Sequence, residues 1–271
     1  MSKQINPDIQ SYTPEAVAER LIITLAKILE EKQRVTLGVP GGRSPGPVIT
    51  ALAHGLDQEI LDRLTLTWID ERWVALNHGD RNDLLILKAW LEGGALPETI
   101  LPLPGIGLDS KFTNGKDQVK ISEALGPKFA YHGDEIDLAR EEFENYLVTT
   151  YGIESDPGSF GLDVALIGIG EDGHLASLFP AHPSLDAQGI IIVCKDSPKP
   201  PALRLSFSLS SLQACKHRFI LVLGPEKGRV LARASKGEQA DIPVSLVLDS
   251  SVCFLDQEAM VAYQQTRAEL E

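Results

Sequence analysis

The sequence predicts an α/β protein with one doubly wound, largely parallel β-sheet and helices on both of its faces. Short, nearly continuous apolar runs such as LTLTWI (64–69) and LDVALIG (162–168) are typical of strands that are buried on both faces. These runs alternate with longer segments whose apolar residues recur at helical spacing. The alternation favours parallel strands that are joined by crossover helices.

The N-terminal part of the chain alternates between helix and strand signals. Thr13 followed by Pro14 is typical of a helix N-cap and first position, and apolar residues then repeat at helical spacing as far as Leu29. The run RVTLGV (34–39) predicts a strand, and a glycine turn then leads into a helix over 48–56. The next expected elements are a strand at 64–69, a helix near 84–91 and a helix over about 135–151.

The C-terminal part continues this alternation. The expected elements are strands at 162–168, 189–193, 203–208 and 217–224, and a helix at 225–234. A polar stretch at 105–133 interrupts the pattern, and we expect a surface excursion because the strand pattern resumes unchanged after it. Ligands of such sheets bind beyond the carboxyl ends of the strands, so the residues that follow strands are the candidates for function.

Length and charge limit the classes of function. The chain has 271 residues, of which 43% are hydrophobic, and we expect one domain over residues 1–271. The formal net charge of -13 argues against a nucleic-acid partner, because such binding needs clustered Lys and Arg. A small anionic ligand stays compatible with this charge, since a few convergent cations and N–H groups set the local field.

Cysteine usage and the N-terminus predict a cytoplasmic protein. Cys194, Cys215 and Cys253 are odd in number and lie in apolar runs, which favours buried free thiols in a reducing compartment. The N-terminus has no cationic start followed by an apolar run. No stretch approaches the roughly 18 to 20 apolar residues of a membrane span, so we expect no membrane partner.

The first candidate site is the glycine turn after the strand at 34–39. It reads Gly41-Gly42-Arg43-Ser44-Pro45, with Ser44 expected as the N-cap and Pro45 as the first residue of the next helix. Free N–H groups at a helix start bind anions, and Arg43 adds positive charge. An ordinary capped turn explains the segment almost as well, and the double glycine favours phosphate only slightly.

A second candidate, Asp70-Glu71-Arg72, directly follows the strand at 64–69. Arg72 has the chemistry to hold a phosphate or to stabilise an oxyanion, and an acidic neighbour such as Asp70 would orient it. A solvated charge cluster at the start of a loop is the commoner outcome for such a triplet. Only its position after a strand makes it a candidate.

The segment GIGEDGH (168–174) matches the G-x-G-x-x-G pattern of dinucleotide sites, with Asp196 about twenty residues further on. Two features argue against a dinucleotide. Pro180 and Pro183 lie where a long crossover helix would run, and two acidic residues would face the pyrophosphate. The glycines, Gly170 among them, instead leave room for a small substrate.

His174 ends this segment and is the candidate general base. Asp172 is close enough in sequence to orient the imidazole, and a neutral imidazole with a carboxylate partner is suited to accept a proton near neutral pH. A structural histidine that bonds its own loop is the competing interpretation. His132 and His182 form no recognisable metal spacing with His174, so we predict no metal site.

Two further basic residues lie next to expected strands in the C-terminal half of the chain. Lys227 lies in the first turn of the helix at 225–234, and Arg204 begins the strand after Pro200-Pro201. Both are candidates to bind an anionic substrate, although a solvated charge is the simpler interpretation of each alone. Cys194 lies within an apolar run, which leaves a covalent cysteine nucleophile with little support.

Taken in order, these segments resemble the 6-phosphogluconolactonase family, within a larger group that includes glucosamine-6-phosphate isomerases. The matching stretches are GGRSP (41–45), DERWV (70–74), LDVALIGIGEDGHLASLFP (162–180), PKPPALRLS (198–206), GPEKGRVL (224–231) and IPVSLVL (242–248). They span nearly the whole chain, and the stretch that ends in DGHLASLFP is the most specific of them.

The resemblance implies a modified Rossmann-like fold and hydrolysis of 6-phosphogluconolactone without a cofactor. It implies His174 as the base toward water, Asp172 as its acidic partner and Arg72 near the reacting end or the phosphate. The residues implied around the sugar phosphate are Gly41, Gly42, Arg43, Ser44, Asp70, Gly170, Arg204 and Lys227. A monomer or a small homo-oligomer is expected.

The chain departs from the family pattern at two positions. Arg43 stands where the family usually has Ser or Thr, and Arg81-Asn82 stands where it has a Ser-Asn pair. Two alternative functions therefore stay open. One is a catalytically weak sugar-phosphate-binding protein, and the other is an aldose–ketose isomerase, whose DGH is followed by a different stretch from the ASLFP found here.

Overall fold

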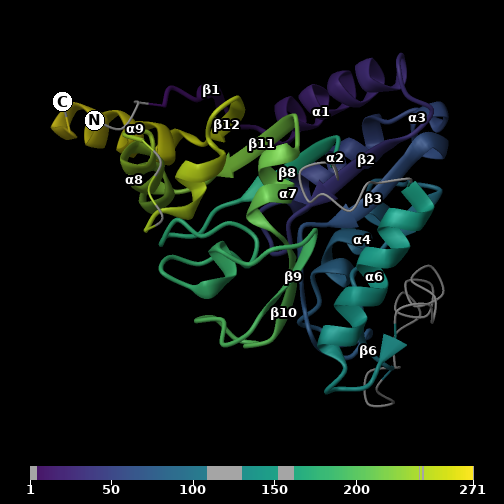
Figure 1. Cartoon of the computed structure of the whole chain (residues 1–271). Helices are drawn as coiled ribbons and strands as arrows, with labels where there is room; N and C mark the ends of the chain where they lie inside the picture. Colours follow the sequence, from purple (N-terminus) through teal and green to yellow (C-terminus); the bar gives the residue numbers. More distant parts are fainter. Residues whose placement is uncertain (1–4, 109–129, 152–161, 238, 240, 271) are drawn as a thin grey trace.

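A parallel β-sheet forms the centre of the protein (Figure 1). The computed structural model describes residues 5–108, 130–151, 162–237, 239 and 241–270. In spatial order the strands are β1 (Asp8–Ser11), β12 (Ser251–Leu255), β11 (His217–Val222), β8 (Val164–Gly168), β2 (Val35–Val39), β3 (Leu64–Trp68) and β5 (Thr99–Leu101). Every neighbouring pair in this sheet is parallel.

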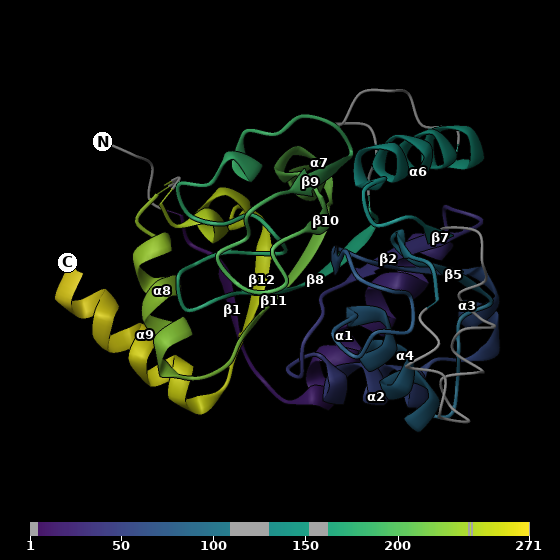
Figure 2. The same ribbon diagram turned by 90° about the horizontal axis from the view of Figure 1, so that it is seen from below.

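Helices cover both faces of the sheet, which confirms the predicted doubly wound α/β fold (Figure 2). One face carries α1 (Pro14–Leu29), α2 (Gly46–Gly55) and α4 (Asn82–Glu92), and the opposite face carries α6 (Ile136–Tyr151) and α7 (Leu209–Ala214). The last two helices, α8 (Pro225–Ala234) and α9 (Gln257–Leu270), pack against each other beside β11 and β12. A short helix, α3 (Gln58–Arg63), leads into β3.

The first helix forms as its sequence pattern predicts. The Thr13 side chain accepts a hydrogen bond of 3.1 Å from the Ala16 N–H, and Pro14 occupies the first helical position. The apolar residues at helical spacing face the sheet and are buried, namely Val17, Leu21, Leu25 and Leu29. An amphipathic stripe of this kind fixes the helix on the sheet because its burial removes apolar surface from water.

The expected strands at 189–193 and 203–208 form, but they do not join the central sheet. As β9 (Ile191–Cys194) and β10 (Arg204–Phe207) they pair antiparallel, and β10 pairs with β4 (Asp70–Arg72) on its other side. The connection between β9 and β10 is shorter than the dozen or more residues that a parallel crossover needs. This small sheet brings Asp70 and Arg72 next to Arg204.

The polar stretch at 105–133 is described only at its ends. There β6 (Gly105–Ile106) and β7 (Ala130–Tyr131) pair as a two-stranded parallel sheet. Residues 109–129 lie outside the described residues, so the predicted surface excursion stays a prediction.

Two further predictions concern the state of the cysteines and the presence of membrane-spanning helices. Cys194, Cys215 and Cys253 are free and buried, as expected. Burial raises the pKa of Cys194 to about 11 and that of Cys215 to about 12, so neither thiol is a nucleophile near neutral pH. Within the described part of the chain, no helix combines the length and the apolar character needed to cross a membrane.

The sheet reverses its direction of growth between β2 and β8. From β2 the chain adds β3 and β5 on one side, whereas from β8 it adds β11 and β12 on the other. Ligands of open α/β sheets bind in the crevice beyond the carboxyl ends of the strands at such a switch point. The turns that follow β2 and β8 carry the two glycine-containing segments of the sequence, 41–45 and 168–174.

Candidate active site

A cavity of about 210 Å³ lies at this switch point. It is lined by residues from the turns after β2 and β8, from β4 and β10, and from the start of α8. The lining includes eight of the residues predicted from the sequence, namely Gly41, Gly42, Ser44, Asp70, Arg72, His174, Arg204 and Lys227. Asp172 and Gly170 lie directly behind His174, whereas Arg43 lies elsewhere.

His174 and Asp172 form a closely bonded pair. The distance between His174 Nδ1 and Asp172 Oδ1 is 2.5 Å. Burial would raise the pKa of Asp172, but the hydrogen bond from His174 and the charges of His174 and Lys199 hold that pKa below its usual range. The carboxylate therefore accepts the Nδ1 proton, which leaves the lone pair of the imidazole on Nε2.

A tight turn holds this pair in place. The Gly170 N–H donates to the His174 carbonyl at 2.9 Å, and the Gly173 N–H donates to the Gly170 carbonyl at 3.0 Å. Gly173 has a φ of 83°, a left-handed conformation that other residues rarely adopt. A Cβ atom on Gly170 would lie 2.1 Å from His174 Nδ1 and 2.4 Å from Asp172 Oδ1. Gly170 thus makes room for the pair, and it is not part of the cavity lining.

We expect Gly170→Ala to reduce turnover by about 10²-fold or more, because the methyl group displaces the His174–Asp172 pair from its geometry. The fold should persist, since the atoms in the way are side-chain tips and not backbone. Gly79→Ala, at an exposed position with open space around it, is the matched control. Wild-type turnover in a folded Gly170→Ala variant would contradict the steric role.

Asp70 and Arg204 form a largely buried pair in the wall of the cavity. Ser177 Oγ donates to Asp70 Oδ2 at 2.7 Å, and Arg204 Nη1 lies 3.7 Å from the same oxygen. Arg204 also donates to the carbonyls of Lys199 at 2.8 Å and Pro201 at 3.1 Å. Most of its donors are therefore engaged by the protein, so its predicted contact with phosphate competes with these bonds.

Arg72 keeps an unpaired donor beside the cavity. Its Nη1 donates to the Asp80 carbonyl at 2.5 Å, which fixes the direction of the side chain. Its Nε is buried and has no hydrogen-bond partner among the described residues. A buried guanidinium donor of this kind gains stability when an anionic oxygen approaches it.

The turn after β2, the helix start that follows it and a lysine also contribute to the cavity. Gly42 adopts a φ of 87°, and the chain turns through Arg43 to Gly46, whose N–H donates to the Arg43 carbonyl at 3.3 Å. The expected N-cap at Ser44 was wrong, because α2 begins at Gly46 after Pro45 and no side chain caps it. Lys227 approaches from the first turn of α8, and burial lowers its pKa.

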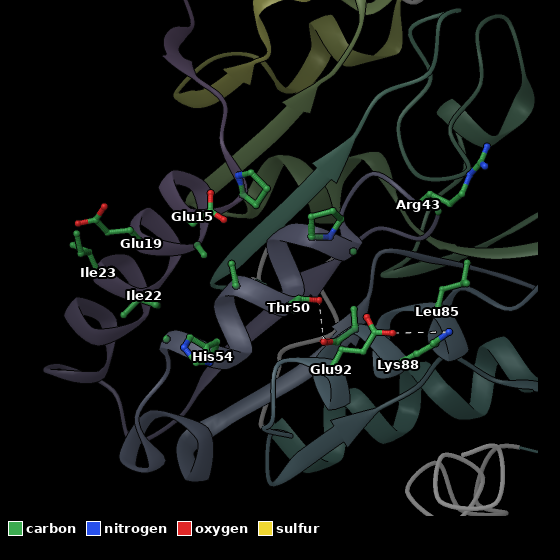
Figure 3. Close-up of a pocket in the computed structure, with 18 residues that line it drawn as sticks. Glu15, Glu19, Ile22, Ile23, Arg43, Thr50, His54, Leu85, Lys88 and Glu92 are labelled. Carbon is green, nitrogen blue, oxygen red and sulfur yellow. Dashed lines mark hydrogen bonds and ion pairs between the residues drawn. The ribbon is translucent and has the colours of Figure 1, made fainter. Parts of the chain in front are cut away.

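Arg43 is not brought into this cavity. It lines a second, larger groove of about 860 Å³ between α1, α2 and α4, where Figure 3 shows its side chain at the rim. The groove contains exposed apolar side chains such as Ile23 and Leu85. The placement of Arg43 therefore gives no support to its predicted contact with the phosphate.

Asn82 and Lys199 contribute to the site although they were not among the predicted site residues. Asn82 lines the cavity and donates to the Asp70 carbonyl at 3.0 Å. A Cβ on Gly41 would lie 1.7 Å from Asn82 Oδ1, so the glycine at this position makes room for the amide. Lys199 Nζ lies 3.3 Å from His174 Nδ1. Lys199 lies in the family-like stretch 198–206, and Asn82 belongs to the Arg81-Asn82 pair that was compared with the family pattern. This resemblance was the signal in the sequence that could have identified both residues.

Arg81, the second departure from the family pattern, lies below the cavity in a buried ionic cluster. Its Nη2 donates to Asp83 Oδ2 at 2.6 Å and to the Leu103 carbonyl at 2.8 Å, and its Nε lies 3.8 Å from Glu71 Oε2. All three charged side chains are nearly or fully inaccessible to solvent. Arg81 therefore fixes the loop that leads to Asn82, and it is not part of the cavity lining.

A doubly wound sheet with a histidine–carboxylate pair and a lysine at its switch point is typical of an α/β enzyme that acts on a small anionic substrate. Residues 10–255 match the family of glucosamine-6-phosphate isomerases/6-phosphogluconolactonase, and the chain belongs to this family. The described residues contain no cluster of three or more His, Cys, Asp or Glu that would bind a metal ion.

Relatives and solved structures agree with this assignment. The 6-phosphogluconolactonase of Streptomyces coelicolor is 28% identical over 226 residues, which cover 82% of this chain and 78% of the relative. A putative 6-phosphogluconolactonase of Neisseria gonorrhoeae is 25% identical with a TM-score of 0.66 and coverage of 92% and 98%. The fold also matches 6-phosphogluconolactonase from Thermotoga maritima, with 21% identity, a TM-score of 0.70 and coverage of 93% and 100%.

Proposed function

We propose that this protein hydrolyses 6-phospho-D-glucono-1,5-lactone to 6-phospho-D-gluconate, the lactone-opening step of the oxidative pentose phosphate pathway. The observation that carries the proposal is the His174–Asp172 pair at the switch point, with Nε2 free of the Asp172 bond and Lys227 in the same cavity. The names of the relatives in this family support the same reaction. We place the enzyme in the cytoplasm, because its three free thiols suit a reducing compartment.

In the proposed mechanism His174 acts as general base and then as general acid. Nε2 accepts a proton from water while the water oxygen attacks the lactone carbonyl carbon, and Asp172 stabilises the imidazolium through Nδ1. The resulting oxyanion accepts hydrogen bonds from the guanidinium group of Arg72, which lines the cavity. The bond between the carbonyl carbon and the ring oxygen then breaks, and the imidazolium returns its proton to that oxygen.

In this proposal the phosphate binds to the turn after β2 and to the start of α8, which both line the cavity. Its ligands would be Lys227, Ser44 and the backbone N–H groups at the start of α2. The N–H groups of a helix start and a desolvated lysine both favour a dianionic phosphate. A sugar lactone that carries a phosphate therefore fits a cavity that contains both the His174–Asp172 pair and Lys227.

The test compares two lactones. We expect the wild-type protein to hydrolyse freshly prepared 6-phosphogluconolactone well above the spontaneous rate, and unphosphorylated gluconolactone with kcat/KM at least about 10²-fold lower, because the phosphate contacts are missing. Proton release in a pH-stat measures both rates. Equal rates with and without protein would contradict the proposal, and ammonia release from glucosamine 6-phosphate would instead indicate the isomerase.

A further inference from the structure

Lys199 lies next to both members of the His174–Asp172 pair. It comes from the segment between β9 and β10, and its Nζ is 3.3 Å from His174 Nδ1 and 3.8 Å from Asp172 Oδ1. It is not part of the cavity lining. Its ammonium therefore acts on the pair without lining the cavity itself.

The backbone of Lys199 is fixed by a dense set of hydrogen bonds. Its carbonyl accepts from Arg204 Nη2 and from Ser197 Oγ, both at 2.8 Å, and its N–H donates to Ser197 Oγ at 3.3 Å. Arg204 is itself buried and paired with Asp70. A lysine that starts from such a rigid segment loses less conformational freedom when its ammonium is held near the imidazole.

The ammonium opposes protonation of the imidazole. Nδ1 carries a proton toward Asp172, and an ammonium has no lone pair, so Lys199 and Nδ1–H cannot bond to each other. What remains is a positive charge next to the ring, which disfavours a second positive charge on it. Asp172 acts in the opposite sense, because its carboxylate favours the imidazolium.

We propose that Lys199 is a positioning residue of this site, which balances Asp172 and so keeps the His174 imidazole unprotonated and able to accept a proton from water. Asp172 alone would orient the ring but also favour the imidazolium, which is not a base. The remaining charged groups that face the ring are Asp70, Arg72, Arg204 and Lys227 across the cavity, with Glu171 beside Lys227. These groups stay unchanged when Lys199 alone is replaced.

The first test is an NMR titration of the His174 ring without substrate, with its signal assigned from its loss in His174→Ala. In Lys199→Met we expect the midpoint of the titration to rise by about half a pH unit to one pH unit, a modest value because Lys199 is half exposed. Lys199→Arg should restore the wild-type midpoint. Lys195→Met is the matched control, because this lysine of the same segment pairs with Asp137 instead. An unchanged midpoint in Lys199→Met, or an equal rise in the control, would overturn the proposal.

The second test measures the pH dependence of kcat/KM and rests on the proposed lactone hydrolysis. A higher midpoint leaves less unprotonated imidazole at low pH, so the acidic limb of the profile should move to higher pH in Lys199→Met. The loss of activity should be about 3- to 10-fold at pH 6 and smaller at pH 8. A loss that is equal at both values would refute the electrostatic role. If wild type shows no lactonase activity, the titration still decides the role of Lys199, so the two failures are distinguishable.

Discussion

His174→Ala is expected to lower kcat for lactone hydrolysis by about 10²- to 10⁴-fold, the usual contribution of a general base. KM should change little, because the proposed phosphate contacts of Ser44 and Lys227 stay in place. The removed ring packs on Phe179 with a centroid distance of 4.7 Å, so a modest loss of stability is expected as well. The measurement is the initial rate with the spontaneous hydrolysis subtracted, together with a thermal unfolding curve.

Two controls separate the loss of the base from the loss of structure. His54→Ala removes an exposed histidine of α2 and should leave kcat unchanged. Added imidazole should restore part of the activity of His174→Ala, since it can enter the vacated space and accept the proton, whereas a merely misfolded variant would not respond. Full turnover in a folded His174→Ala protein would remove His174 from the mechanism.

The central part of the fold was predictable from the sequence because burial leaves a direct trace there. β8 is buried along almost its whole length and appears as an uninterrupted apolar run, and α1 shows both its cap and its apolar spacing. The edge strands β1 and β5 left no such trace. β1 is largely exposed and β5 has only three residues, so neither produces a recognisable pattern.

The positions of the candidate site residues were predictable for a related reason. Residues that follow parallel strands meet at one edge of the sheet, so Asp70, Arg72 and His174 were brought together as expected. The partners of each side chain were not predictable. The bonds of Arg204 to the 199–201 carbonyls and the approach of Lys199 to His174 depend on how the small antiparallel sheet packs. No local periodicity encodes such contacts.

Arg81→Met is expected to lower the free energy of unfolding by about 3–5 kcal/mol, the usual cost of removing one partner from a buried ion pair. The substitution leaves Glu71 and Asp83 without their shared cation, and both carboxylates are inaccessible to solvent. Methionine fills much of the space but supplies no donor to the Leu103 carbonyl. Urea unfolding followed by tryptophan fluorescence measures the change, since Trp68 and Trp90 are fully buried in the core.

The deficit of Arg81→Met should also grow with pH. The pKa of Glu71 is raised from 4.5 to about 7, because burial and the charge of Asp83 raise it by more than Arg81 and the backbone N–H groups lower it. A carboxyl group whose pKa is higher in the folded protein contributes stability below its unfolded pKa of 4.5 and loses it as the pH rises through about 7. Without Arg81 the pKa of Glu71 in the folded protein rises again, so the loss of stability in Arg81→Met should be larger at pH 8 than at pH 5.

The control variant is Arg34→Met, which breaks an exposed pair with Glu98 and should cost below about 1 kcal/mol. If Arg81→Met costs no more than this control, water reaches the cluster and the buried ion pair does not hold the loop below the cavity.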